Sequence, residues 1–152
     1  QPVSTVILYN HESPRRPDTF VTRKITKAAA RIANGSDEPL HLGNMSARRD
    51  WGFAGDYVRA MRGAVRADEP DDFVIATGIS HSIEDFVSQA FAAAGITDWR
   101  AHVAVDEGLL RPQDPADFVG DASKAERVLG WRPEVDFAGL VAMMVEHDLA
   151  LQ

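Results

Sequence analysis

Short apolar runs alternate along the chain with longer stretches in which apolar residues recur every three or four positions. Val3–Tyr9 and Phe73–Ala76 are rich in β-branched and aromatic residues and end at polar or glycine-containing turns, a pattern typical of buried strands. Leu40–Leu42 and His102–Val105 are shorter strand candidates. Helical patterns separate these strands, so the order of elements predicts an α/β fold.

The first helical pattern covers residues 18–34 and is followed by Gly35 as a C-terminal stop. One stripe of this predicted helix is apolar and consists of Val21, Ile25, Ala28, Ala29 and Ile32. Lys24, Lys27 and Arg31 share another face by the same spacing. A second helix is predicted over residues 54–65, and its inward face is expected to carry Tyr57, Val58, Met61 and Val65.

Three more helices are predicted in the second half of the chain. Ser82 has the form of an N-cap with an acidic first turn, ahead of a helix that ends near Gly95. Asp121 or Ser123 is expected to cap a short helix closed by Gly130. The last helix covers residues 137–149. The three tryptophans are interpreted as packing anchors: Trp51, Trp99 and Trp131.

Composition narrows the class of protein. The 152 residues match the length of one domain, so we expect residues 1–152 to form a single unit. The net charge of −7 argues against nucleic-acid binding, which requires a basic surface. Without cysteine the chain has no disulfide or thiolate metal site, and no apolar run is long enough for a membrane span. A cytoplasmic location is expected. The chain begins without Met, which leaves open a cut or a trimmed end.

Polar residues crowd the end of the first predicted strand. Asn10, His11, Glu12, Arg15 and Arg16 follow that strand, and ligands of open α/β sheets bind beyond the carboxyl ends of strands. The next helix begins nearby and offers free N–H groups to an anion.

Two further basic positions, Arg48-Arg49 and Arg111, could converge with Lys24 on a pyrophosphate. The alternative for each arginine is a solvated surface charge. The alternative for His11 is a hydrogen-bonded structural role.

The sequence lacks the common motifs of cofactor binding and catalysis. The chain has neither a glycine-rich dinucleotide fingerprint nor a P-loop lysine, and neither tyrosine is followed by a lysine four residues on. A serine nucleophile elbow is missing as well, and the histidines lack metal-ligand spacing, so no metal site is expected. The sequence indicates binding without a catalytic centre.

A set of short motifs resembles a known family in order and spacing across essentially the whole chain. The motifs are Tyr9-Asn-His-Glu-Ser-Pro-Arg-Arg16, Phe20-Val-Thr-Arg-Lys-Ile25, Leu42-Gly-Asn44, Arg49-Asp-Trp-Gly52, Asp56-Tyr-Val58, residues 68–78, Arg111-Pro112, Gly120-Asp121 and Leu129-Gly-Trp131. Together they resemble the C-terminal half of the GDP-mannose 4,6-dehydratases, which are extended short-chain dehydrogenases/reductases. The resemblance implies the substrate-binding portion of that fold, with strands and a helix that would complete a Rossmann-type sheet.

The resemblance also implies roles for individual residues. His11 and Arg16 match positions that contact NADP. The positions that match the surroundings of the GDP-sugar, or belong to the motifs beside it, are Asn10, Val21, Lys24, Asn44, Arg49, Arg111 and Asp114, the last where the family more often has Glu. The family's catalytic Thr or Ser, Glu and Tyr-x-x-x-Lys lie in the other half, so no catalytic residue is assigned here.

The implied reaction converts GDP-mannose to GDP-4-keto-6-deoxymannose: C4 is oxidised, water is eliminated across C5 and C6, and the hydride returns to C6. This chain alone is expected to be inactive, and a homo-oligomer is expected. Pro17, Phe53 and Gly108-Leu-Leu110 depart from the family pattern, which leaves the exact sugar open. The alternatives are a related NDP-sugar reductase or epimerase, and a non-catalytic nucleotide-sugar binding module.

Overall fold

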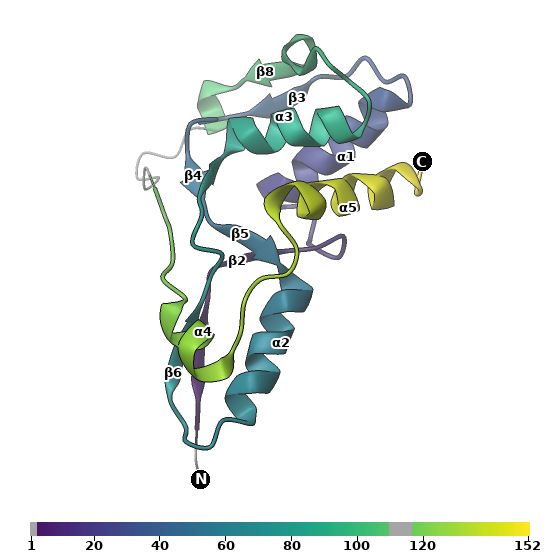
Figure 1. Cartoon of the computed structure of the whole chain (residues 1–152). Helices are drawn as coiled ribbons and strands as arrows, with labels where there is room; N and C mark the ends of the chain where they lie inside the picture. The colour runs from purple at the N-terminus through teal and green to yellow at the C-terminus, as the bar shows by residue number, and fades with distance from the viewer. Residues whose placement is uncertain (1–2, 110–116) are drawn as a thin grey trace.

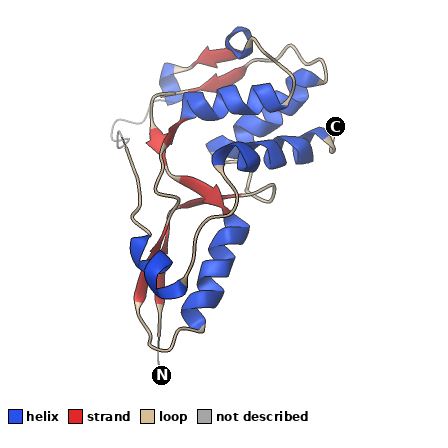
Figure 2. Ribbon diagram, in the orientation of Figure 1, coloured by secondary structure: helices blue, strands red, loops and turns tan. Residues whose placement is uncertain are grey.

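The strands of the computed structural model, which describes residues 3–109 and 117–152, pair in short two-stranded ladders (Figures 1 and 2). Three ladders are parallel and one is antiparallel. The parallel pairs are β1 (Thr5–Leu8) with β6 (Asp72–Ile75), β2 (Asn10–Glu12) with β5 (Trp51–Phe53), and β3 (Leu40–Leu42) with β8 (Val103–Val105). The antiparallel pair is β4 (Arg48–Arg49) with β7 (His81–Ser82). Parallel pairing with intervening helices confirms the predicted α/β class.

The helices divide between two regions of the molecule. In Figure 1, α1 (Val21–Ala33), α3 (Ile83–Ala93) and α5 (Phe137–Leu149) gather in the upper part beside β3 and β8. The lower part holds α2 (Ala54–Val65) and α4 (Ser123–Leu129) against β1 and β6. Two 3₁₀ turns, at Trp99–His102 and Glu107–Leu109, flank β8.

Each region has its own hydrophobic core. The upper core joins α1, α3 and α5, and Trp51 and Trp99 are buried in it. The lower core packs Tyr57 and Trp131 against Phe73 of β6. All three tryptophans are at most 7% exposed, so their interpretation as packing anchors is confirmed. The β2–β5 ladder lies between the two regions (Figure 1).

Local signals explain several helix ends. The hydroxyl of Ser82 accepts a hydrogen bond from the Asp85 amide, and the Asp85 carboxylate accepts one from the Ser82 amide, which forms the capping box predicted for α3. Gly35 and Gly130 follow α1 and α4 with φ of 93° and 63°, a backbone conformation that glycine adopts without strain. The amide of Ser123 donates to the Asp121 carboxylate just before α4.

Two predictions about burial were wrong. β1 is a strand, but its residues alternate between exposed and partly buried, with Ile7 52% exposed, because no other described element covers its second face. On α2 the buried positions are Asp56, Tyr57, Ala60 and Ala64, whereas Val58 and Val65 are exposed. The small residues let α2 lie close to its neighbours, and the larger apolar residues form an outward strip.

The polar segment after β1 was also interpreted too simply. Residues 10–12 were expected to be a turn, yet they form β2 by pairing with β5. The partner strand is about forty residues away in sequence, so no local pattern could indicate it. The interpretation of residues 1–152 as one unit stays a prediction.

Candidate functional site

The β2–β5 ladder brings two of the sequence motifs together. Its register sets Asn10 opposite Trp51 and His11 opposite Gly52. Arg49 therefore lies two residues before a strand that is hydrogen-bonded to the polar segment after β1. A side chain on Gly52 would collide with the ring of Tyr57, because a Cβ there would lie 2.5 Å from Cε2 of that ring. Close packing thus requires glycine at the centre of the ladder.

The imidazole of His11 has a defined tautomer. Its Nδ1 lies 2.8 Å from the carbonyl oxygen of Tyr9, and a carbonyl oxygen can only accept, so Nδ1 carries the proton in the neutral ring. The ring is also held by Tyr57, with ring centroids 5.5 Å apart. The neutral His11 therefore has Nε2 as a hydrogen-bond acceptor.

Glu12 anchors the start of α1 to β2. Its buried carboxylate accepts a hydrogen bond of 2.7 Å from the Thr22 hydroxyl and forms a 3.2 Å ion pair with Nε of Arg16. Burial raises the pKa of Glu12, and this outweighs the lowering by Thr22, Arg16 and His11. The guanidinium of Arg16 stacks over the ring of Phe20 at 3.5 Å.

Both the backbone and the side chain of Arg49 make contacts within the fold. The β4–β7 ladder pairs it with His81, and its Nη1 donates to the carbonyl oxygen of Arg48 at 2.6 Å. The ring of His81 stacks on Phe137 with centroids 3.8 Å apart, and burial lowers the pKa of His81. The backbone of Arg49 is therefore paired with a residue that stacks on Phe137, the partly buried first residue of α5.

Asp50 connects Arg49 to the carboxyl end of β6. Its carboxylate is 1% exposed and accepts four hydrogen bonds. One oxygen receives the amide and the hydroxyl of Thr77 at 2.9 and 2.6 Å. The other receives the amides of Gly78 at 2.9 Å and Gly120 at 3.3 Å. The amide of Asp50 itself donates to the carbonyl of Phe118. Three segments of the chain therefore meet at one carboxylate.

Tyr57 lies fully buried beneath the ladder. Burial raises the pKa of its hydroxyl, and the nearby carboxylates of Asp50, Asp56 and Glu12 raise it further. The hydroxyl has no hydrogen-bond partner among residues 3–109 and 117–152. Tyr57 is therefore a neutral phenol whose ring packs against His11 of β2 and Gly52 of β5.

Other residues implied by the resemblance lie nearer the upper core. Nζ of Lys24 donates to the carbonyl oxygen of His41 at 2.6 Å, which ties α1 to β3. Asn44 follows β3, and its side-chain oxygen accepts from both the amide and the hydroxyl of Ser46. Val21 is the first residue of α1 and packs against the upper core. Arg111 and Asp114 lie outside the described residues.

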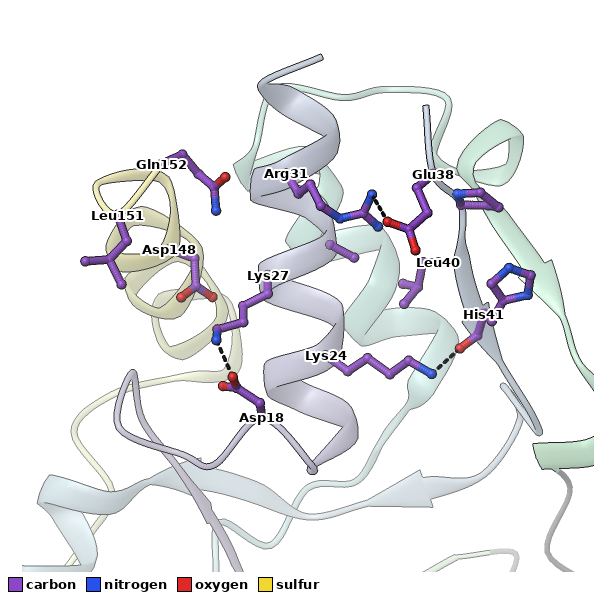
Figure 3. A pocket seen from close by; sticks show the side chains of 12 residues that line it. Asp18, Lys24, Lys27, Arg31, Glu38, Leu40, His41, Asp148, Leu151 and Gln152 are labelled. Atoms are coloured by element: carbon purple, nitrogen blue, oxygen red, sulfur yellow. Dashed lines mark hydrogen bonds and ion pairs between the residues drawn. The ribbon is translucent and has the colours of Figure 1, made fainter. Parts of the chain in front are cut away.

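A pocket of about 600 Å³ lies on the exposed face of α1, between β3 and the end of α5 (Figure 3). The face shared by Lys24, Lys27 and Arg31 lines it, as their spacing predicted. Lys27 pairs there with Asp18, and Arg31 pairs with Glu38 at 2.9 Å. Lys27 and Arg31 already have acidic partners, and Asn10, His11 and Arg49 are not among the residues that line this pocket. The better candidate site is therefore the group on and beside the β2–β5 ladder, called the strand-end cluster below: Asn10, His11, Glu12, Arg16 and Arg49.

The sequence indicated the arginines and His11 but not how they are supported. Thr22 and Tyr57 were not predicted to be site residues, and Asp50 was noted only as part of the stretch Arg49-Asp-Trp-Gly52. A carboxylate that receives backbone amides from distant segments leaves no local pattern. The stretch Arg49-Asp-Trp-Gly52 was the available signal, because a charge directly before a buried tryptophan must itself be close to the interior.

Within the described ranges, no three His, Asp or Glu side chains gather as a metal site would require. No helix in those ranges has the length and apolar character needed to cross a bilayer.

Comparisons with known proteins identify the family of the chain and its fold. The family model described as GDP-mannose 4,6 dehydratase matches residues 1–144. GDP-mannose 4,6 dehydratase 1 of Arabidopsis thaliana is 51% identical over 145 residues, which are 95% of this chain and 40% of that protein. The chain thus spans well under half the length of this relative.

Two solved structures share the fold at low identity. RMD from Pseudomonas aeruginosa, complexed with NADPH, superposes with a TM-score of 0.86 and 17% identity over 97% of this chain and 48% of that one. UDP-glucose 4-epimerase from Thermotoga maritima, solved with UDP-glucose, superposes with a TM-score of 0.81 and 22% sequence identity. That match covers 95% of this chain and 45% of the epimerase chain. Both structures therefore share the α/β fold of this chain over about half of their own length, and the match over residues 1–144 places the chain in the GDP-mannose 4,6 dehydratase family.

Proposed function

We propose that this chain is the sugar-nucleotide-binding part of a GDP-mannose 4,6-dehydratase, a lyase that converts GDP-mannose to GDP-4-keto-6-deoxymannose. The family match over residues 1–144, with 51% identity to the Arabidopsis enzyme, carries the proposal. The strand-end cluster supports it, because the pairing of β2 with β5 brings Asn10 and His11 near the strand that follows Arg49, although Arg49 lies about forty residues away in sequence.

The proposed substrate contacts follow from charge and geometry. A GDP-sugar carries a diphosphate, and a guanidinium fork binds phosphate oxygens bidentately. Arg49 and Lys24 supply positive charge from two elements, and Asn10 and Asn44 supply amide groups for hydroxyls or the base. Val21 supplies apolar contact at the start of α1. The same role is proposed for Arg111 and Asp114, which lie outside the described residues.

We further propose NADP as the cofactor, with His11 and Arg16 as contacts from this chain. Nε2 of His11 is an acceptor for an amide or hydroxyl of the dinucleotide, given the tautomer fixed by Tyr9. The guanidinium of Arg16 is held beside His11 by its ion pair with Glu12 and by stacking on Phe20, which places a positive charge at this strand end for an anionic group of the dinucleotide. Two neighbouring folds were solved with NADPH or NAD. The dinucleotide, when bound, supplies the hydride chemistry.

The role of this chain in the reaction is to bind and orient. The acid–base groups implied by the resemblance belong to the other half of the enzyme, and such groups contribute about 10²–10⁴ in rate. A cytoplasmic location and a homo-oligomer remain predictions. A related reductase or epimerase is less well supported, since the family match and the Arabidopsis relative both carry the dehydratase name.

The test is turnover by a fusion protein. The preceding half of the Arabidopsis relative, joined to Gln1, would supply the acid–base groups (this protein is called the fusion below). The fusion should convert GDP-mannose to the 4-keto-6-deoxy sugar with NADP, and the 152-residue chain should not. Product is identified by mass spectrometry. Turnover by the chain alone, or a fusion that binds NADP but leaves GDP-mannose unchanged, would contradict the proposal.

A further inference from the structure

Asp50 hydrogen-bonds the turn after β6 and the segment before α4 to the segment that joins β4 and β5. It lies between β4, which carries Arg49, and β5, which pairs with β2. The donors to its carboxylate come from the turn after β6 and from Gly120. No other residue type could satisfy these donors in the same space, since a carboxylate accepts on both oxygens and an amide on only one.

The segments held by Asp50 also enclose the end of β1. Gly120 packs against Tyr9 so closely that a Cβ there would lie 2.9 Å from the Tyr9 ring and 2.3 Å from Cβ of Ala76. The amide of Tyr9 donates to the carbonyl of Ile75. Asp50 therefore fixes Arg49 relative to the strand end that continues into Asn10 and His11.

We infer that Asp50 is a positioning residue of the sugar-nucleotide site, which rests on the proposed function. It does not touch the ligand. Its buried carboxylate holds the backbone of Arg49 at a set distance from the strand ends, so that the guanidinium meets the diphosphate without first being ordered. Ordering a long side chain on binding costs affinity, and a fixed backbone reduces that cost.

Asp50→Asn tests this with little change of shape. Whichever way the amide is turned, its NH₂ faces either the two groups of Thr77 or the amides of Gly78 and Gly120, so one pair of donors loses its acceptor. Asp56→Asn is the matched control. Asp56 is also 1% exposed and accepts amides of Glu134 and Val135, but it lies on α2 and not beside Arg49.

A double-mutant cycle separates positioning from general stability. GDP affinity of the fusion is measured by calorimetry, with melting temperature alongside. Arg49→Ala is expected to weaken GDP binding about 10- to 150-fold, and Asp50→Asn about 10-fold. The double variant should bind like Arg49→Ala alone, because Asp50 acts through Arg49. Asp56→Asn should lower the melting temperature while leaving GDP affinity within twofold.

Each outcome decides the matter. If the parent fusion does not bind GDP, the proposed function fails and this inference with it. If the parent binds GDP, the inference alone is overturned by any of three results: Asp50→Asn binding within twofold of the parent, losses that multiply in the double variant, or an equal loss for Asp56→Asn. Should Asp50→Asn not fold, Thr77→Val removes one donor at constant shape. Thr77→Val should weaken GDP binding two- to fivefold in the parent fusion. It should not change the GDP affinity of a fusion that already carries Arg49→Ala, and failure of either result overturns the inference.

Discussion

Glu12, Asp50, Asp56 and Asp148 are each only 1% exposed, and their charges are met in different ways. Asp148 faces the guanidinium of Arg23, Asp50 and Asp56 accept mostly backbone amides, and Glu12 depends on one hydroxyl and an ion pair. A buried charge is tolerated only when it is paired or hydrogen-bonded. At the scale of residues, the partners around each carboxylate determine whether it stabilises the fold at neutral pH.

Glu12 gives the clearest pH dependence. Because burial raises its pKa in the folded chain, the folded state holds the proton more tightly than the unfolded state does. The protonated Glu12 therefore contributes to the free energy of unfolding. This contribution is complete below the ordinary carboxyl pKa and is lost as pH rises through the raised pKa of Glu12. We therefore expect the unfolding free energy of the parent, relative to Glu12→Gln, to fall as pH rises from about 4. Urea denaturation at a series of pH values measures it.

Thr22→Val supplies the control for this prediction. The Thr22 hydroxyl lowers the pKa of Glu12, so its removal should make the loss of stability with rising pH larger. A difference between parent and Glu12→Gln that stays flat with pH would show that Glu12 has an ordinary pKa.

Arg49 carries the proposed contact with the diphosphate. A hydrogen bond to a charged group contributes roughly 1.5–3 kcal/mol, so Arg49→Ala should weaken GDP binding by the fusion about 10- to 150-fold. Arg49→Lys should recover only part of this loss, because an ammonium cannot reproduce the bidentate fork. Arg66 at the end of α2 is exposed and serves as the control: Arg66→Ala should bind GDP normally. Equal affinity of all three variants and the parent would remove Arg49 from the site.

At the scale of elements, the sequence predicted what local patterns determine. The approximate bounds predicted for α2 and α5 agree with the structure, and Ser82 and Gly130 marked helix ends as expected. The ladders formed by β2, β4, β5 and β7 were not predicted, because these short segments are polar or contain glycine and become strands only through partners distant in sequence. The buried face of α2 was also misassigned, since Val58, Met61 and Val65 satisfy helical periodicity as well as the true buried set does.

Two glycines make a matched pair for testing packing between elements. A Cβ on Gly120 would lie 2.3 Å from Cβ of Ala76, whereas a Cβ on Gly63 within α2 would meet nothing closer than 3.6 Å. Gly120→Ala should therefore destabilise the chain by about 1–3 kcal/mol through overpacking. Gly63→Ala should stabilise it by about 0.5–1 kcal/mol, because alanine favours the helix. Chemical denaturation of both variants measures these changes, and a stabilising Gly120→Ala would contradict the close contact.

At the scale of the whole molecule, apolar surface lies uncovered on two adjoining elements. β1 pairs with β6 along one edge, and no described strand pairs along its other edge. On α2, Val58 is 52% and Val65 85% exposed, and Met61 lines shallow grooves beside them. An unpaired strand edge and a contiguous apolar strip both favour association with another chain or segment.

We therefore expect the isolated 152-residue chain to self-associate. Replacing Val58 and Val65 together by Lys should reduce this association without lowering the melting temperature, because both side chains are exposed. Val128 on α4 is 51% exposed outside the strip, so Val128→Lys should leave association unchanged. Light scattering and binding of a hydrophobic dye measure the effect. The fusion should bind less dye than the chain, since the added half is expected to cover β1 and α2. A parent chain that is monomeric at high concentration and binds no dye would show that these surfaces need no partner.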